Sequence, residues 1–194
     1  MSYQNPLTLV TLIQPERLED LYSYLSGLKY ALEKGTHSLL KNSNTIHYMR
    51  WVIIDDKNSP NKNTIFFKEG PERPPKLVFS SNFDGSVNQH LKDLCDTDEG
   101  KLIDRIYGCC IDYPDTENIS LESRKDFLKK CEVKASAFYR GSPKRSLKQI
   151  MDEKKLRLHV RDLLKNGKWD NLSSREIHKQ IKNKIGSILD YEWI

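Results

Sequence analysis

Apolar residues recur along residues 7–140 with two different periods, which predict strands and helices in turn. Residues 7–13 (LTLVTLI) are short, rich in β-forming side chains and apolar on both faces, which is typical of a central strand covered on both sides. Leucines then recur at spacings of three and four and predict an amphipathic helix that ends near Gly35; they are Leu18, Leu21, Leu25, Leu28 and Leu32.

Residues 46–54 predict a second strand, because alternate side chains there divide into two sets. His47 and Trp51 fall on one face and Arg50 falls on the other. Neither face is cleanly polar, so we expect both faces of this strand to be at least partly covered.

A long connection and a third strand come next. Residues 57–75 are rich in Asn, Lys and Pro and predict the connection, with a short extra strand at residues 64–67. Residues 77–83 predict the third strand. Residues 84–86 (Asp-Gly-Ser) then turn the chain into a second helix, because Asp before Gly favours a turn and Ser favours a helix N-cap.

The remaining pattern predicts a helix at residues 121–130, a fourth strand at residues 133–139 and helices alone after that. The simplest topology is a ferredoxin-like βαββαβ fold of the α+β class, with a four-stranded antiparallel sheet and added C-terminal helices. We expect a ferredoxin-like domain at residues 1–142 and a helical extension, packed on it, at residues 143–194.

Composition narrows the class of protein further. The chain has 194 residues, of which 37% are hydrophobic and 30% charged, and these values favour a folded globular protein over a disordered one. No apolar run approaches the ~18 residues of a membrane span. The first residues lack a basic segment and a signal cleavage site, so we expect a cytoplasmic location and no membrane partner.

Charge is unevenly distributed along the chain. Residues 1–120 hold 13 Lys+Arg and 17 Asp+Glu, whereas residues 121–194 hold 19 Lys+Arg and 10 Asp+Glu. A basic last third fits either an acidic partner such as nucleic acid or a solvated helical surface. We favour the solvated surface, because the lysines alternate with acids and lack the aromatic platforms of single-strand binders.

Cysteine chemistry adds no site to this picture. The four cysteines form no C-x-x-C pair, and no Cys/His spacing resembles a zinc site, so we predict no metal. Without a secretory signal, we expect the thiols to be reduced and buried.

Candidate ligand-binding residues lie on the second predicted strand. His47 can act as a general base, as a metal ligand or haem ligand, or as a structural histidine near a strand end, and we favour the structural role. Arg50 can hold a carboxylate or phosphate in a fork, or can pair with Asp84 or Asp104. Because His47 and Arg50 project to opposite faces of a regular strand, they do not easily share one site.

The end of the third predicted strand carries a second polar group. Asn82 and Asp84 alternate onto one face, where they can orient a polar substrate, and a desolvated Asp84 can act as a base. The alternative is local turn chemistry between a strand and a helix. The catalytic candidates are therefore His47 and Asp84. The ligand-binding candidates are Arg50, Asn82, Ser81 and Tyr139.

Four segments carry a resemblance: LTLVTLIQP, IHYMRWVIIDD, LVFSSNFDG and ASAFYRGSPKRSLKQI. Together they are similar to a poorly characterised bacterial family with an FSSNFDG-like third strand. The implied fold resembles the ferredoxin-like, dimeric α+β barrel group, which includes small monooxygenases and dye-decolourising peroxidases. That resemblance implies haem as a cofactor and a homodimer as an assembly, but none of the group's haem-binding motifs matches this sequence.

These observations favour a small-molecule-binding protein whose ligand lies over the helix-free face of the sheet. By analogy of fold, an oxidoreductase of the monooxygenase or peroxidase type is the expected activity. The alternative is a non-catalytic module that binds a protein partner, and nucleic acid is the less favoured partner.

Overall fold

The chain forms two compact units, residues 1–144 and residues 145–194, which we call the N-terminal unit and the helical unit. A computed structural model describes residues 4–35, 45–55, 74–115, 117, 119–141, 144–167, 169 and 172–186; it leaves the side chains of residues 97–100 and 184 undescribed. The extra strand predicted at residues 64–67 lies outside the described residues.

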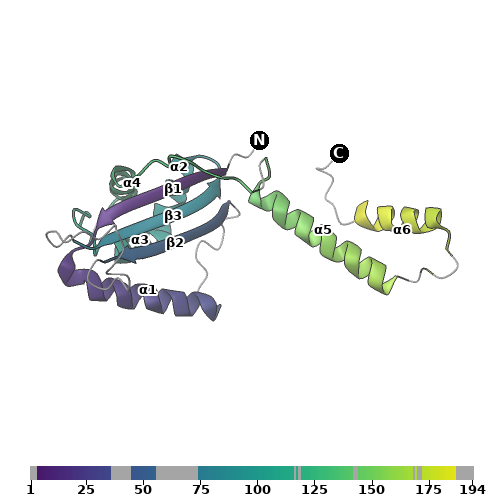
Figure 1. Ribbon diagram of the computed structural model, residues 1–194, viewed down its shortest axis with the longest axis horizontal. Coiled ribbons are helices and arrows are strands. Elements are labelled where there is room, and N and C mark those ends of the chain that lie inside the picture. Colours follow the sequence, from purple (N-terminus) through teal and green to yellow (C-terminus); the bar gives the residue numbers. More distant parts are fainter. Residues whose placement is uncertain are drawn as a thin grey trace, which may run out of the picture. The chain divides into compact units, whose positions relative to one another are not determined.

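The N-terminal unit is built on three antiparallel strands: β1 (Gln4–Leu12), β2 (Ile46–Ile54) and β3 (Lys76–Asp84). Their order across the sheet is β1-β3-β2, so β3 lies in the centre and pairs with both neighbours along its length (Figure 1). The three strands lie where the sequence pattern predicts them.

The prediction of a four-stranded ferredoxin-like sheet is wrong, because the sheet formed by the described residues has three strands. Residues 133–139 form no ladder; beside β1 there is one bridge, between Leu9 and Glu132, flanked by hydrogen bonds from Val10 N to Cys131 O and from Val133 N to Thr8 O. Residues 132–137 are exposed, so their short or charged side chains bury little surface to hold a longer strand against β1.

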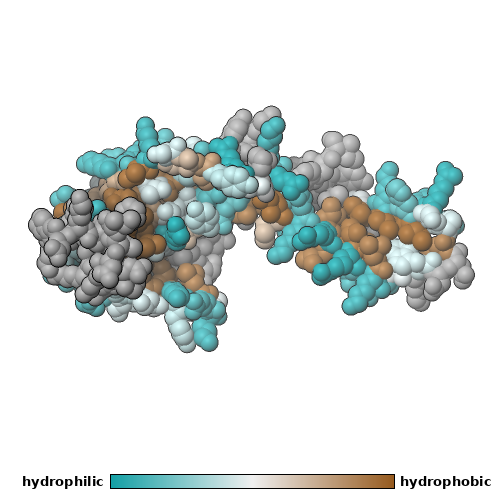
Figure 2. All heavy atoms as spheres, in the orientation of Figure 1, coloured by the Kyte–Doolittle hydropathy of each residue, from teal (hydrophilic) through white to brown (hydrophobic). Residues whose placement is uncertain are grey.

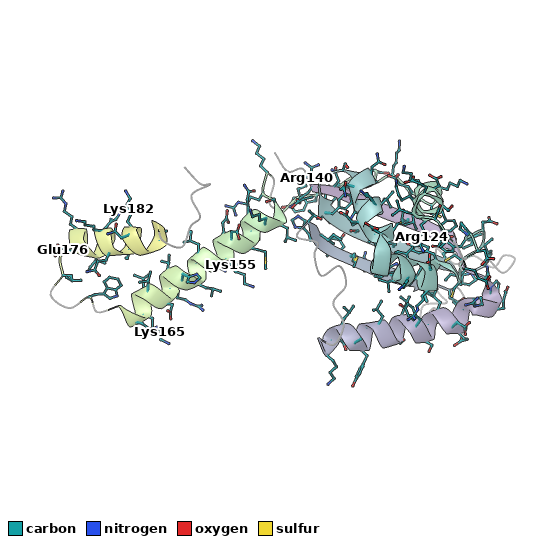
Figure 3. All side chains as sticks on the ribbon, turned by 180° about the vertical axis from the view of Figure 1, so that it is seen from behind. Arg124, Arg140, Lys155, Lys165, Glu176 and Lys182 are labelled. Carbon is teal, nitrogen blue, oxygen red and sulfur yellow. The ribbon has the colours of Figure 1, made fainter. Side chains whose placement is uncertain are left out.

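One face of the sheet is covered by helices. They are η1 (Pro15–Arg17), α1 (Leu18–Glu33), α2 (Val87–Cys95), α3 (Thr97–Tyr107) and α4 (Leu121–Lys130). Seen from behind, α2 and α3 lie over the strands (Figure 3). The core on this side includes Leu9, Phe79, Phe83, Ile106 and Leu128, each at most 1% exposed.

The other face of the sheet carries no helix of the described N-terminal unit, and it is the face turned to the viewer in Figure 1. The strand register defines rows that run across this face from β1 through β3 to β2: Pro6–Asn82–Tyr48, Thr8–Ser80–Arg50, Val10–Val78–Val52 and Leu12–Lys76–Ile54. Tyr48, Val52 and Ile54 are 51%, 41% and 44% exposed. We call this surface the helix-free face.

The described part of the helical unit contains α5 (Leu147–Asn166) and α6 (Ser174–Gly186), which contact each other. A capping box begins α5: Gln149 N donates to Ser146 Oγ at 3.1 Å, and Ser146 N donates to Gln149 Oε1 at 2.8 Å. No residue of α5 is buried, and Figure 2 shows apolar residues along both helices. Among the described residues, no helix combines the length and apolar character that crossing a membrane requires.

Candidate functional site

A β-bulge on β2 sets the position of His47. Ile46 pairs with Phe83 and Tyr48 pairs with Asn82, so His47 is the extra residue between two regular pairs. A bulge of this kind redirects the side chains around it. Ile46 packs against the core as Met49 does, and His47 therefore leaves the alternation that predicted it beside Met49.

The redirected His47 meets Asp84, the last residue of β3. The Nε2 atom of His47 lies 3.1 Å from Oδ1 of Asp84, and the two side chains are 13% and 6% exposed. The backbone supports the same junction, since Asp84 N donates to Thr45 O at 2.8 Å. When Nε2 carries the proton and donates to the carboxylate, Nδ1 of His47 is left as a proton acceptor.

Asn82 lies one row from this pair on the helix-free face, between Pro6 and Tyr48. Its Oδ1 atom is buried and receives no hydrogen bond among the described residues. A buried acceptor without a donor costs about 1–3 kcal/mol, so this oxygen is a place where a ligand's donor gains a hydrogen bond.

Arg50 lies in the next row, level with Ser80 and Thr8. Successive rows on one face are about 7 Å apart, so a long arginine side chain reaches the row of Asn82. The two acids that sequence analysis offered as partners are engaged elsewhere: Asp84 with His47 and Asp104 with Arg124. Arg50 is exposed and has no ion pair within the described parts of the chain.

Arg50 also borders a groove between α1 and β2. The groove has a volume of about 450 Å³ and is lined mainly by apolar side chains, among them Leu25, Leu28, Met49 and Trp51. Because β2 is an edge strand, an exposed side chain on it has access both to the sheet face and to the groove beside the sheet.

Ser81 and Tyr139 do not join this group. Ser81 alternates to the helix-covered face, where it is 2% exposed and its Oγ has no hydrogen-bond partner in the described part of the chain. Tyr139 is 89% exposed and lies outside any strand. The structure therefore brings together His47 and Asp84, places Asn82 and Arg50 in neighbouring rows, and leaves Ser81 and Tyr139 apart.

His90, a lone histidine on α2, is buried. It is 2% exposed and stacks on Phe83, with ring centroids 3.8 Å apart and an interplanar angle of 13°. Neither ring nitrogen has a hydrogen-bond partner among the residues that the structure describes, and burial lowers the pKa of His90 to about 4. Its spacing from Val87 and Leu94 on α2 was the available signal, because residues at i, i+3 and i+7 share one helix face.

A second polar cluster, unnoticed in the sequence, joins α3 to α4. Arg124 donates from Nε to Oδ1 of Asp104 at 2.8 Å and from Nη2 to Oδ2 at 2.6 Å, and Tyr113 donates to the same carboxylate at 2.6 Å. Bidentate pairs of this type are strong and fix orientation. The cluster lies among core aromatic rings, so it stabilises the helix layer behind the sheet.

A cavity of about 640 Å³ is lined by Thr11 of β1 and by residues of α4. Its lining mixes charges and a thiol, and includes Asp112, Asp126, Lys130 and Cys131. None of the residues predicted from sequence to bind a ligand borders this cavity. The described residues contain no group of three or more side chains suited to hold a metal ion.

Comparison with protein-family models, with curated proteins and with solved structures found no match for this chain.

Proposed function

We propose that the helix-free face binds a small amphipathic organic acid. The observation that carries the proposal is the sequence of rows on this face: a polar end with His47 and Asp84, then Asn82, then Arg50, then a row of three valines. In the last row Lys76 lies between Leu12 and Ile54. Arg50 holds the anionic group of the ligand, because a guanidinium presents several donors to a carboxylate, sulfonate or phosphate.

The apolar part of the ligand lies on the rows beyond Arg50. Val10, Val78 and Val52 form one row and Leu12, Lys76 and Ile54 the next. Val52 and Ile54 are more than 40% exposed, so a ligand that covers them removes apolar surface from water. Burial of apolar surface is worth about 25 cal/mol per Å².

The polar end of the face supplies the chemistry. Asn82 offers its unsatisfied Oδ1 to a hydroxyl or amide of the ligand. His47, held through Nε2 by Asp84, offers Nδ1 as a proton acceptor to a group in the same region. We propose ligand binding with proton transfer by His47 as the activity of this face.

The oxidoreductase activity, the haem cofactor and the homodimer stay predictions. They rested on the resemblance to a four-stranded fold, whereas the part of the sheet that the structure describes has three strands. The row arrangement on the helix-free face supports the binding proposal without that resemblance.

A fluorescent acid tests the proposal. The probe is anilinonaphthalene sulfonate, which joins an apolar ring system to an anionic group, and Nile red serves as an uncharged apolar probe. We expect Arg50→Gln to weaken binding of the sulfonate about tenfold, the loss of one charge-assisted contact of about 1.4 kcal/mol, and to leave Nile red unchanged.

Arg105→Gln is the matched control, because Arg105 is an exposed arginine on α3, behind the sheet. Equal losses in both variants would show that the sulfonate responds to net charge alone. No loss in Arg50→Gln would remove Arg50 from the site.

A non-catalytic interaction module is the second candidate, favoured by one observation. Tyr48, on the same face, is 51% exposed although it is a large aromatic side chain of the kind that anchors protein interfaces. The sulfonate titration distinguishes the two candidates. If the face binds a protein partner and no acid, Arg50→Gln leaves the affinity for the sulfonate unchanged.

A further inference from the structure

The helical unit carries the whole net charge of the chain. Residues 1–144 contain 20 Lys+Arg and 20 Asp+Glu, whereas residues 145–194 contain 12 Lys+Arg and 7 Asp+Glu. The net charge of +5 therefore belongs to the smaller unit. The acids of α5 are engaged within the helical unit: Glu153 with Arg145 at 3.0 Å, Asp152 with Lys155 at 3.9 Å and Asp162 with Asn166 at 2.7 Å.

The less exposed side of α5 carries an apolar stripe. Leu156, Val160 and Leu163 are half-buried there, and Ile177 and Ile181 are half-buried on α6. Because α5 and α6 contact each other, we infer that these half-buried residues form the apolar contact between the two helices. At about 100° per residue, the α5 stripe spans a narrow arc of the helix.

The opposite side of α5 carries a second stripe, which we call the basic seam. It comprises Leu147, Met151, Lys154, Leu158, Arg161 and Lys165. The intervals between these positions are four, three, four, three and four, which is the a/d spacing of a coiled coil. Met151 and Leu158 are 47% and 43% exposed, and Figure 3 shows Lys165 near the end of α5.

The basic seam has charges at positions that a coiled coil fills with apolar side chains. Lys154, Arg161 and Lys165 form no ion pair or hydrogen bond within the described residues. A second copy of α5 would place like charges against one another, which is destabilising. The apolar residues of α5 also span a narrow arc and include no aromatic residue, whereas helices that lie in a membrane surface have a broad apolar face with aromatic side chains.

We propose that the basic seam of α5 binds an amphipathic helix of a partner protein whose apolar stripe is flanked by acidic residues. The partner's apolar side chains cover Leu147, Met151 and Leu158, and its carboxylates pair with Lys154, Arg161 and Lys165. This is helix recognition by anchors at coiled-coil spacing, with charge selecting the partner. The inference stands on the helical unit and is independent of the ligand proposed for the helix-free face.

Three synthetic helical peptides test the proposal on the full chain. Each has leucine at the a and d positions of three heptads, and the flanking positions carry glutamate, glutamine or lysine. We expect the glutamate peptide to bind at least about tenfold more tightly than the glutamine peptide, with an affinity that falls as salt is added, and the lysine peptide not to bind.

Two double variants with equal net charge locate the interaction. Lys154→Glu with Arg161→Glu changes the seam, and Lys148→Glu with Arg157→Glu changes bases that lie about 90° away on the same helix. We expect the seam variant to bind the glutamate peptide about tenfold or more weakly than the native chain does, and to bind the lysine peptide. The affinity of the control variant for the glutamate peptide is expected to stay within about twofold of the native value. Circular dichroism confirms that both variants keep their helices.

Other occupants give distinct results, each of which overturns the proposal. Equal losses in the two variants would indicate binding by net charge alone. Self-association of the native chain in sedimentation, abolished by Leu158→Asp, would indicate a second copy. Seam-dependent binding to vesicles of phosphatidylserine and phosphatidylcholine, without binding of the glutamate peptide, would indicate a membrane surface.

Discussion

The imidazole of His47 lies 3.1 Å from the carboxylate of Asp84, although the two residues are 37 positions apart in sequence. A single extra residue on β2 brings them together, because the bulge between Ile46 and Tyr48 turns His47 out of the alternation. The pair marks the polar end of the helix-free face. The free energy of interaction between the two side chains can be measured.

The first prediction concerns this pair. His47→Gln and Asp84→Asn, combined in a double-mutant cycle, are expected to show a coupling free energy of about 1 kcal/mol, since the two side chains are largely shielded from water. Urea unfolding of the four chains measures the coupling. A coupling near zero would mean that the two side chains act separately and that Asp84 does not orient the imidazole.

The second prediction concerns acid stability. Burial lowers the pKa of His90 to about 4 in the folded chain from 6.5 in the unfolded chain, so between these values the unfolded chain binds more protons. Stability therefore falls as pH drops below about 6.5, and the His90 contribution is fully lost below about pH 4. Between pH 7 and pH 5 we expect the free energy of unfolding to fall by about 2 kcal/mol through this residue.

His90→Phe is the matched variant for that measurement, because it keeps an apolar ring beside Phe83 and removes the proton site. Urea unfolding at pH 7 and pH 5 compares the two chains. Parallel pH profiles for the native chain and the variant would assign the acid sensitivity to other groups.

The third prediction concerns the cluster that joins α3 to α4. Asp104→Asn leaves the Arg124 guanidinium largely buried without its carboxylate, since the side chains of Arg124 and Asp104 are 15% and 13% exposed in the native pair. We expect a loss of about 3 kcal/mol in the free energy of unfolding, and a smaller loss of about 1 kcal/mol for Tyr113→Phe, which removes one hydrogen bond. Losses of equal size would show that the ion pair contributes little beyond the hydrogen bond of Tyr113.

The fourth prediction compares two glycines that have open space around their Cα atoms. Gly85, between Asp84 and the N-cap of α2, has a φ of +101°, whereas Gly27 lies inside α1. Gly85→Ala is expected to destabilise the fold by about 1 kcal/mol or more, and Gly27→Ala to stabilise it by up to about 1 kcal/mol. Thermal unfolding of both variants decides the point, and a neutral Gly85→Ala would contradict the requirement for a positive φ at the end of β3.

The local elements were predictable where one period dominates the sequence. The leucine spacing of α1, the alternation of β2 and the serine N-cap of α2 each specify an element through neighbouring residues alone. The fourth strand was not predictable in the same way. Residues 133–139 have strand-like composition, but whether they pair with β1 depends on the surface they bury, which the local pattern does not contain.

The candidate site was predicted residue by residue but not as an arrangement. His47 and Asp84 were selected for their chemistry, and the bulge that joins them has no signature in the sequence. Regular alternation also separates His47 from the face of Arg50, and only the register with β3 shows that Asn82 and Arg50 occupy neighbouring rows. The burial of His90 has no sign in the sequence apart from the spacing of this residue on α2.

The most direct test of the binding proposal is an NMR titration of the full chain with decanoate, followed through backbone amide shifts. We expect the largest shifts at Arg50, Val52 and Val78, in the rows that hold the acid group and the alkyl chain, and none at Leu91 or Ile103 behind the sheet. Shifts confined to Leu25 and Leu28 in the groove beside α1, or no saturable shifts on β2 and β3, would contradict a ligand site on the helix-free face.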